Sequence, residues 1–204
     1  MRRLRQTKRK NIFTIPFESE QQAANEISEI VKWLVEFRGG VFERNVSFDE
    51  QVSNVAKWMT EGKKKCLVLC GSVGNGKTTM MQAIASIYNA ARLQNTKGYV
   101  MEFVKVDVFD IDKADSSEIE RIKNTPLLAI DDFGFENLSV KEYGNERIPM
   151  IEILSKRYDI DGITILTTNM PPDKIKGRYG VRIADRLAET ATFIPFTNQT
   201  YRRK

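Results

Sequence analysis

The 204-residue sequence predicts an α/β fold of three layers, in which a mostly parallel five-stranded sheet carries helices on both faces. From residue 65 onward, short apolar runs alternate with stretches of helical periodicity, which is the order typical of a parallel sheet. Three of the runs, at 65–70, 127–131 and 163–168, are apolar almost throughout, as expected of strands that are covered on both faces. A hydrophobic content of 41% is enough for a full core at this length.

Two helices are predicted before the sheet begins. The first opens at Ser19 in a Ser-x-x-Gln capping box, carries an apolar stripe at helical spacing and ends at Gly39-Gly40. The second opens at Ser47 in a Ser-x-x-Glu capping box and stops near Gly62. The stripes are most simply explained as core-facing. The first helix has an alternative role, since it stands apart from the rest of the pattern and is free to dock a partner.

The alternating part of the chain supplies the remaining elements. Helices are predicted over 76–94, 116–123, 146–158 and 180–189, and further strands over 98–110 and 192–197. Pro149 is tolerated in the first turn of its helix. Pro195 fits an edge strand, because proline cannot donate a hydrogen bond to a neighbouring strand.

A glycine-rich loop follows the first strand of the sheet and precedes a helix, which is the context that the pattern G-x-x-x-x-G-K-[ST] requires. Its glycines let consecutive N–H groups face inward, Lys77 would reach the β- and γ-phosphates, and the Thr78 hydroxyl would hold Mg²⁺. The loop predicts binding of a nucleoside triphosphate, and the alternative is a glycine-rich turn that happens to hold a lysine and a threonine. The candidate nucleotide-binding residues here are Gly71, Ser72, Val73, Gly74, Asn75, Gly76, Lys77, Thr78 and Thr79.

Polar residues end two of the buried strands. The strand at 127–131 ends in Asp131 and is followed by Asp132, so that Asp131 would bind the Mg²⁺ shell and Asp132 would orient or deprotonate the attacking water. Asn169 follows the strand at 163–168 and would position the same water. The alternatives are a turn-forming Asp-Asp-Phe-Gly loop and a strand-terminating asparagine.

Two arginines lie one turn apart on the helix predicted at 180–189. Like charges at this spacing are mildly destabilising, by a few tenths of a kcal/mol. The functional interpretation is that Arg182 or Arg186 reaches a phosphate on a neighbouring subunit as an arginine finger. The alternative is a solvated charged face in which Asp185 and Glu189 relieve the repulsion.

The formal charge of +5 is unevenly distributed. Residues 1–10 hold six Lys and Arg and no acid, which leaves 26 basic against 27 acidic residues in the rest of the chain, and three of those 26 lie in the last four residues. This pattern indicates flexible arms near a polyanion. Cys66 and Cys70 are about 13 Å apart in an extended strand, too far for a disulfide, and fit small buried residues in a reducing cytosol.

Several classes of chemistry and location are excluded by composition. The absence of histidine rules out imidazole acid–base catalysis and histidine metal sites. The basic start is followed by no apolar segment of a signal peptide, and no apolar run approaches the length of a membrane span. A cytoplasmic protein without a membrane partner is expected.

In the order of their motifs and in their residues, these segments resemble the AAA+ ATPases of the DnaC and IstB type, which are replicative helicase loaders and transposition helper ATPases. The resemblance covers about residues 47–202, and its most specific stretch runs from Asn169 to Leu187. It implies a P-loop NTPase with an AAA+ core and little or no C-terminal lid. By this resemblance Asn169 is the sensor asparagine, Arg186 is the finger with Arg182 beside it, and Arg202 approaches the nucleotide.

Three departures from the family bear on the partner. Asp132 stands where the family often has glutamate, so that hydrolysis is expected to be slow. The segment between the second and third strands looks too short for the extra helices with which loaders grip single-stranded DNA. The region before residue 47 is shorter than a usual helicase- or transposase-binding domain.

These observations predict a basic tail with a helical extension at 1–46 and an AAA+ ATPase domain at 47–204. The expected function is an ATP- and Mg²⁺-dependent assembly factor in DNA replication, resembling a helicase loader, which binds single-stranded DNA and a replicative helicase and forms a homo-oligomer with ATP. One alternative is a transposition helper with a transposase as its partner. A second is an ATP-bound module with little turnover. A small-molecule kinase would need an acceptor pocket and a lid, for which no segment is found.

Overall fold

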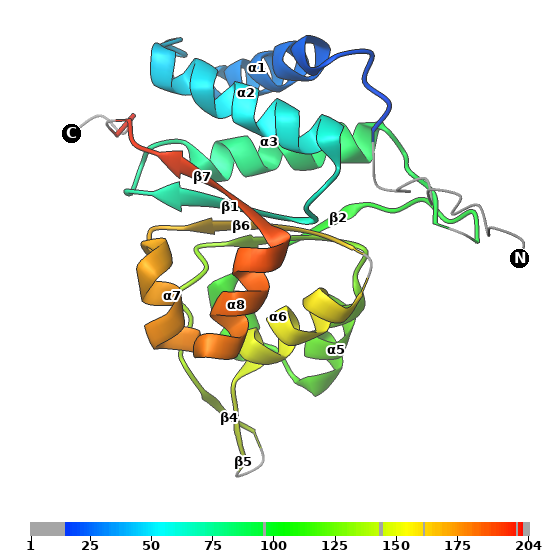
Figure 1. Cartoon of the computed structure of the whole chain (residues 1–204), viewed down its shortest axis with the longest axis vertical. Coiled ribbons are helices and arrows are strands. Elements are labelled where there is room, and N and C mark those ends of the chain that lie inside the picture. The colour runs from blue at the N-terminus through cyan, green and yellow to red at the C-terminus, as the bar shows by residue number, and fades with distance from the viewer. Residues whose placement is uncertain (1–14, 96, 143–144, 161, 199, 202–204) are drawn as a thin grey trace, which may run out of the picture.

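Five parallel strands form the central sheet, in the order β2-β3-β6-β1-β7 (Figure 1). The computed structural model describes residues 15–95, 97–142, 145–160, 162–198 and 200–201. The strands are β1 Cys66–Gly71, β2 Phe103–Asp107, β3 Leu127–Asp131, β6 Ile163–Thr168 and β7 Ala191–Phe196. The predicted fold class is confirmed, and the order places β1 between two strands from the far end of the chain.

Helices cover both faces of this sheet (Figure 1). One face carries α1 Glu20–Phe37, α2 Val46–Glu61 and α3 Lys77–Ala90. The other carries α4 Val108–Lys113, α5 Ser116–Asn124, α6 Pro149–Asp159, α7 Pro172–Tyr179 and α8 Val181–Thr190. Within the described ranges no helix has the length and apolar character needed to cross a bilayer.

The side chains of β1 divide between two cores, one on each face of the sheet. Leu67 and Leu69 pack with the first group of helices, whereas Cys66, Val68 and Cys70 pack with the second. This division follows from the strand geometry, in which successive side chains point to opposite faces. Because both faces are covered, the alternation is between two apolar environments, and the strand is apolar along its whole length.

The two N-terminal helices are part of the first core. Ser19 caps α1 as predicted, by accepting from Gln22 N–H at 3.1 Å, and α1 contributes Ala23, Ile27 and Val31 to the core. The predicted cap of α2 is wrong, because the side chain that accepts from the helix start belongs to Asn45. The helix therefore begins at Val46, and it ends as predicted at Gly62, which has a φ of 58°.

Three other predicted boundaries are corrected by the structure, which also contains one helix that was not predicted. The strand-like segment 98–110 is a strand only over β2, because the Asp107 side chain accepts from Phe109 N–H and starts α4. The helix predicted over 76–94 ends at Ala90. The helix predicted from residue 146 begins at Pro149, since β4 Val140–Glu142 and β5 Asn145–Arg147 form a hairpin before it. Sequence reasoning did not predict α7.

The segment between β2 and β3 contains two short helices, α4 and α5, where one was expected. At the other edge of the sheet, β7 pairs only with β1 among the described strands, so that Pro195 is in an edge strand as predicted. The predicted division of the chain at residue 46 coincides with the start of α2. It remains a prediction, since α1 and α2 share one core.

Candidate functional site at the carboxyl end of the sheet

The loop between β1 and α3 has the backbone conformation that its glycines allow. Gly71, Gly74 and Gly76 all have positive φ angles, of 155°, 81° and 95°. A Cβ atom on Gly71 would lie 2.2 Å from the carbonyl oxygen of Phe196, so that only glycine fits there. Gly76 is the N-cap of α3 and provides no side-chain cap, which leaves the start of the helix suited to an anion.

Lys77 is the buried cation of this loop, with 5% of its surface exposed. Its ammonium donates to the carbonyl oxygens of Gly71 at 2.9 Å and Ser72 at 2.7 Å. It also donates to the side-chain oxygens of Asn75 at 3.1 Å and Asn169 at 2.7 Å. The predicted phosphate-binding lysine and the predicted sensor asparagine are therefore in direct contact, although 92 residues separate them.

The end of the described chain holds the loop from its other side. Asn75 donates to Phe196 O at 2.5 Å, and Tyr201 N–H donates to Gly74 O at 2.8 Å. The Asn198 amide donates to Asn75 O at 3.2 Å. Arg202, the predicted nucleotide contact at the C-terminus, lies outside the described residues.

The remaining predicted loop residues lie nearer the surface. Ser72 and Val73 are exposed at the tip. The Thr79 hydroxyl accepts from the Arg38 guanidinium at 3.1 Å, at the end of α1. This contact connects the first turn of α3 to the N-terminal helix.

Thr78 and Asp131 meet at the neighbouring strand end, as a Mg²⁺ site would require. The Thr78 hydroxyl donates to the Asp131 carboxylate at 3.0 Å, and the Asp131 side chain is 10% exposed. Lys105 lies 3.7 Å from the other carboxylate oxygen. A hydroxyl beside a single carboxylate fits Mg²⁺, which is commonly bound by one or two carboxylates together with substrate phosphates. The described residues contain no cluster of three or more metal-binding side chains.

Asp132 lies directly beyond the end of β3 in a left-handed conformation, with φ at 59°. Its backbone N–H donates to the Thr167 hydroxyl at 2.9 Å, and the same hydroxyl donates to Asp131 at 2.5 Å. One threonine thus orients both acids. Sequence reasoning missed Thr167, although two hydroxyl residues at the end of an otherwise apolar strand were a visible signal.

The two arginines of α8 are not brought to this site. The Arg186 guanidinium lies over the Tyr158 ring, 4.5 Å from its centroid, and contacts Ser155 O at 3.4 Å. It lines a cavity of about 310 Å³ together with Lys63, Lys64 and Lys65, which precede β1. Arg182 is exposed on the same helix. Both arginines therefore lie on α8, away from the loop of their own chain.

Comparisons with known proteins agree with this geometry. Residues 41–204 match the family described as IstB-like ATP binding protein. The chain is 29% identical to the replicative helicase loader DnaI of Bacillus subtilis over 119 residues, which are 58% of this chain and 37% of DnaI. It thus matches well under half of the length of that relative.

Two solved structures share the fold. The DnaC helicase loader is 19% identical, with a TM-score of 0.57 over 76% of this chain and 92% of DnaC. AMPPCP-bound DnaA from Aquifex aeolicus is 21% identical, with a TM-score of 0.56 over 76% of this chain and 48% of DnaA.

Proposed function

The chain belongs to the family of IstB-like ATP-binding proteins, and from that premise we propose that it hydrolyses ATP with Mg²⁺ and acts in DNA replication as a helicase-loader-like assembly factor. The resemblance to the DnaC/IstB type of AAA+ protein is confirmed by the family match and by the DnaI relative. Hydrolysis, the metal and the partners are proposals.

One observation carries the ATPase proposal. The Lys77–Asn169 contact of 2.7 Å and the Thr78–Asp131 contact of 3.0 Å bring residues from three different strand ends into one cluster. These residues lie at the carboxyl ends of adjacent parallel strands, which is where ligands bind in open α/β sheets. The contacts of Asn169 and Asp131 with the glycine-rich loop support a shared role for these residues in binding the phosphates and Mg²⁺.

We assign each residue a task in hydrolysis. The glycine-rich loop and Lys77 would hold the β- and γ-phosphates, and Thr78 and Asp131 would hold Mg²⁺, which neutralises charge on the phosphates. Asp132 would accept a hydrogen bond from the attacking water and orient it, with Asn169 beside the γ-phosphate. The positive φ of Asp132 turns the chain sharply at this point, which supports a role for its carboxylate outside the sheet.

The cluster lacks an arginine from its own α8, so we propose that Arg186 acts on the nucleotide of a neighbouring copy, with Arg182 beside it. This arrangement would require a homo-oligomer in the ATP-bound state. It also predicts that an isolated protomer turns over slowly.

For partners, we propose a replicative helicase and single-stranded DNA. The DnaI and DnaC matches support the helicase, and the basic tail at residues 1–10, outside the described residues, supports electrostatic contact with DNA. Deletion of residues 2–10 should weaken binding to single-stranded DNA and flatten its salt dependence, because fewer phosphates are neutralised. An unchanged salt slope would contradict this contact.

The ATPase proposal is tested by Asp132→Asn. The variant removes the carboxylate charge but keeps the shape, so ATP affinity should stay within about threefold while turnover falls by about 10²–10⁴. Phosphate release and titration with a fluorescent ATP analogue measure the two effects. Wild-type protein that binds ATP but releases no phosphate under any assembly condition would instead support the ATP-bound module.

A transposition helper is the second candidate, favoured by the IstB-like family match over residues 41–204. Capture experiments with ATP and with ADP, using a purified replicative helicase and a purified transposase as separate baits, distinguish the two. Retention by the helicase alone supports the loader, and retention by the transposase alone supports the helper.

A further inference from the structure

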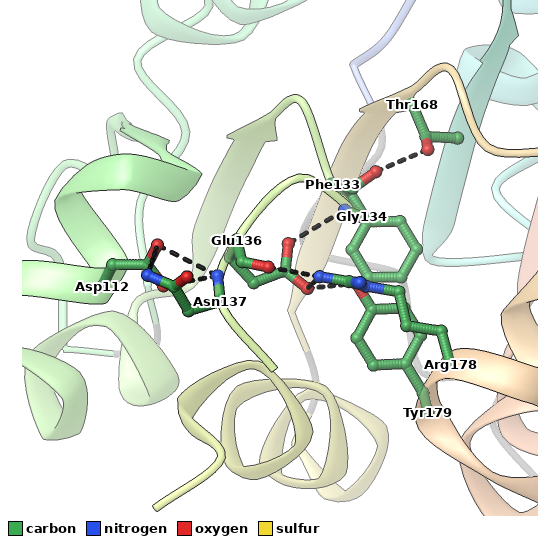
Figure 2. Close-up of polar contacts among 8 residues, drawn as sticks. All are labelled: Asp112, Phe133, Gly134, Glu136, Asn137, Thr168, Arg178 and Tyr179. Carbon is green, nitrogen blue, oxygen red and sulfur yellow. Dashed lines mark hydrogen bonds and ion pairs between the residues drawn. The ribbon is translucent and has the colours of Figure 1, made fainter. Parts of the chain in front are cut away.

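A buried carboxylate with no assigned task lies four residues beyond Asp132. The Glu136 side chain is 2% exposed. Its Oε2 accepts from Gly134 N–H at 2.9 Å, and its Oε1 accepts from the Tyr179 hydroxyl and, at 3.4 Å, from the Arg178 guanidinium (Figure 2). The guanidinium also donates to the Glu136 carbonyl. One carboxylate therefore joins the loop after β3 to the end of α7.

The loop that Glu136 holds is the one that begins with Asp132. Phe135 N–H donates to Asp132 O at 3.0 Å and closes a β-turn, in which Gly134 takes the positive φ of 103°. Phe133 donates its N–H to β6 at 2.8 Å, and its carbonyl accepts from the Thr168 hydroxyl at 2.5 Å (Figure 2). With the Glu136 bond to Gly134 N–H, all four consecutive N–H groups from Asp132 to Phe135 are hydrogen bonded.

Two further contacts make the attachment rigid. The Phe133 ring stacks on the Tyr179 ring, with centroids 4.8 Å apart and an interplanar angle of 12°. On the other side of Glu136, Asn137 N–H donates to the Asp112 carboxylate of α4 at 3.0 and 3.1 Å (Figure 2). The turn is therefore held between α4, β6 and α7.

Burial of a carboxylate is costly unless hydrogen bonds replace water. Glu136 meets this condition with donors from Gly134, Tyr179 and Arg178. Burial, together with the hydrogen bond to Glu136, raises the pKa of Tyr179 above its ordinary value, so that the phenol remains a donor throughout the neutral and moderately alkaline range. An apolar side chain in this place would leave Gly134 N–H and the Tyr179 hydroxyl without the acceptor that Glu136 provides.

We propose that Glu136 is a positioning residue for ATP hydrolysis, which holds the Asp132 turn in its productive place by tying it to Tyr179 and Arg178. The inference rests on the proposed ATPase function. Glu136 does not act as the base itself, because it is buried and both of its oxygens already accept hydrogen bonds.

The contacts of Glu136 with Tyr179 and Arg178 also connect the turn at Asp132 to α8, the helix that carries the two arginines. Tyr179 is the last residue of α7, and Gly180 then caps α8, which carries Arg182 and Arg186. A shift of the Asp132 turn would be transmitted to α8 through Gly180, the single residue between the two helices. Glu136 therefore orients the acid and, through α7, the helix that is proposed to act on a neighbouring copy.

The test compares Glu136→Gln and Tyr179→Phe with a matched control, Tyr88→Phe. Tyr179→Phe keeps the ring stack with Phe133 and removes only the hydroxyl, which donates to Glu136 and accepts from Arg178 Nε at 3.2 Å. Tyr88 is also a buried tyrosine packed against a phenylalanine, but it faces the opposite core. Turnover at saturating ATP, KM, affinity for a fluorescent ATP analogue and thermal midpoint are measured for all three and for wild type.

In Glu136→Gln and in Tyr179→Phe, kcat should fall at least tenfold, while KM and ATP affinity should stay within about twofold of wild type. Tyr88→Phe should keep its kcat even where its thermal midpoint falls as much as that of Tyr179→Phe. A lowered midpoint with unchanged kcat in folded Tyr179→Phe would show a structural role and overturn the inference.

An equal loss of kcat in the control would overturn it as well, because the effect would then follow from stability. If Glu136→Gln does not fold, Tyr179→Phe decides the question. Wild-type protein without turnover under any assembly condition would overturn the ATPase proposal itself, whereas active wild type with fully active variants would overturn this inference alone.

Discussion

The two ends of the central sheet differ in which of the predicted site residues they hold. At the carboxyl end, Lys77 donates to Asn169 at 2.7 Å and Thr78 donates to Asp131 at 3.0 Å. At the amino end, Arg186 lines a basic cavity with the lysines that precede β1, and its guanidinium rests on the Tyr158 ring. The length of β1, about 16 Å, separates the two ends.

The difference teaches which groups one chain can bring together. Adjacent parallel strands place their carboxyl ends side by side, so the loop, the acids and the asparagine converge because of the strand order alone. A helix that leads back to the start of the next strand carries its residues towards the opposite end. An arginine on α8 thus lies far from the nucleotide site proposed for its own protomer, which is the basis for proposing that it acts on a neighbouring copy.

The strongest test of the carboxyl end is Lys77→Ala. It removes the cation proposed to hold the phosphates and the contacts that hold the loop closed, so ATP affinity should fall by a hundredfold or more. Lys63→Ala is the matched control, since Lys63 is an exposed lysine at the amino end. Titration with a fluorescent ATP analogue measures both, and equal affinities for the two variants would contradict the assignment of the site.

The amino end is tested by Arg186→Ala. An arginine finger supplied by another subunit is worth about 10³–10⁵ in rate, so turnover should fall by at least that lower figure while ATP binding is retained. Mixing Arg186→Ala with Lys77→Ala should recover activity, because one variant keeps an intact loop and the other keeps its arginine. If the mixture assembles but remains inactive at every ratio, Arg186 is part of a solvated helix face and does not act on the nucleotide of a neighbouring copy.

The smallest expected effects concern the reaction rates of the two cysteine thiols. Cys66 lies at the amino end of β1 and Cys70 near its carboxyl end. Burial raises the pKa of the Cys66 thiol to about 12, despite the lowering effect of Arg157 and Lys64, and burial also raises that of Cys70. Because the thiolate is the reactive form, both should react with an aromatic disulfide reagent at pH 8 more slowly than in the unfolded chain. ATP should slow Cys70, which adjoins Gly71, by several-fold and leave Cys66 unchanged.

The variants Cys66→Ala and Cys70→Ala allow each thiol to be followed alone. Since the folded pKa lies above the unfolded one, each thiol favours folding below about pH 9 and loses this contribution as the pH rises further, for Cys66 up to about pH 12. Urea unfolding at pH 8 and pH 10.5 should show this loss, and it should be smaller in Cys66→Ala. Protection of Cys66 by ATP would contradict the separation of the two ends.

Sequence reasoning succeeded where the signal was local. The apolar strands, the glycine-rich loop and the cap at Ser19 depend on neighbouring residues, and they lie where they were predicted. The start of α4 was missed, because Val108 and its apolar neighbours also fit a strand and only the Asp107 cap decides between the two.

The missed site residues share a different cause. Thr167 orients acids 35 and 36 residues away, and Glu136 meets Tyr179 across 43 positions. Their roles arise from tertiary proximity, which no spacing in the sequence reveals. The fold, the loop and the acid pair were therefore predictable. The polar end of β6 was visible in the sequence, but the partners of Thr167 and Glu136 were not.

The packing of β1 between β6 and β7 has a consequence for the order of events during synthesis. The ribosome releases β1 early, but both of its partners come from the last 42 residues, and Gly71 closes against Phe196 only when β7 is in place. Such non-local pairings form late and leave unpaired strand edges exposed until then. A nascent chain should thus be unable to hold nucleotide until β7 has emerged, so that ATP binding would mark the closure of this sheet.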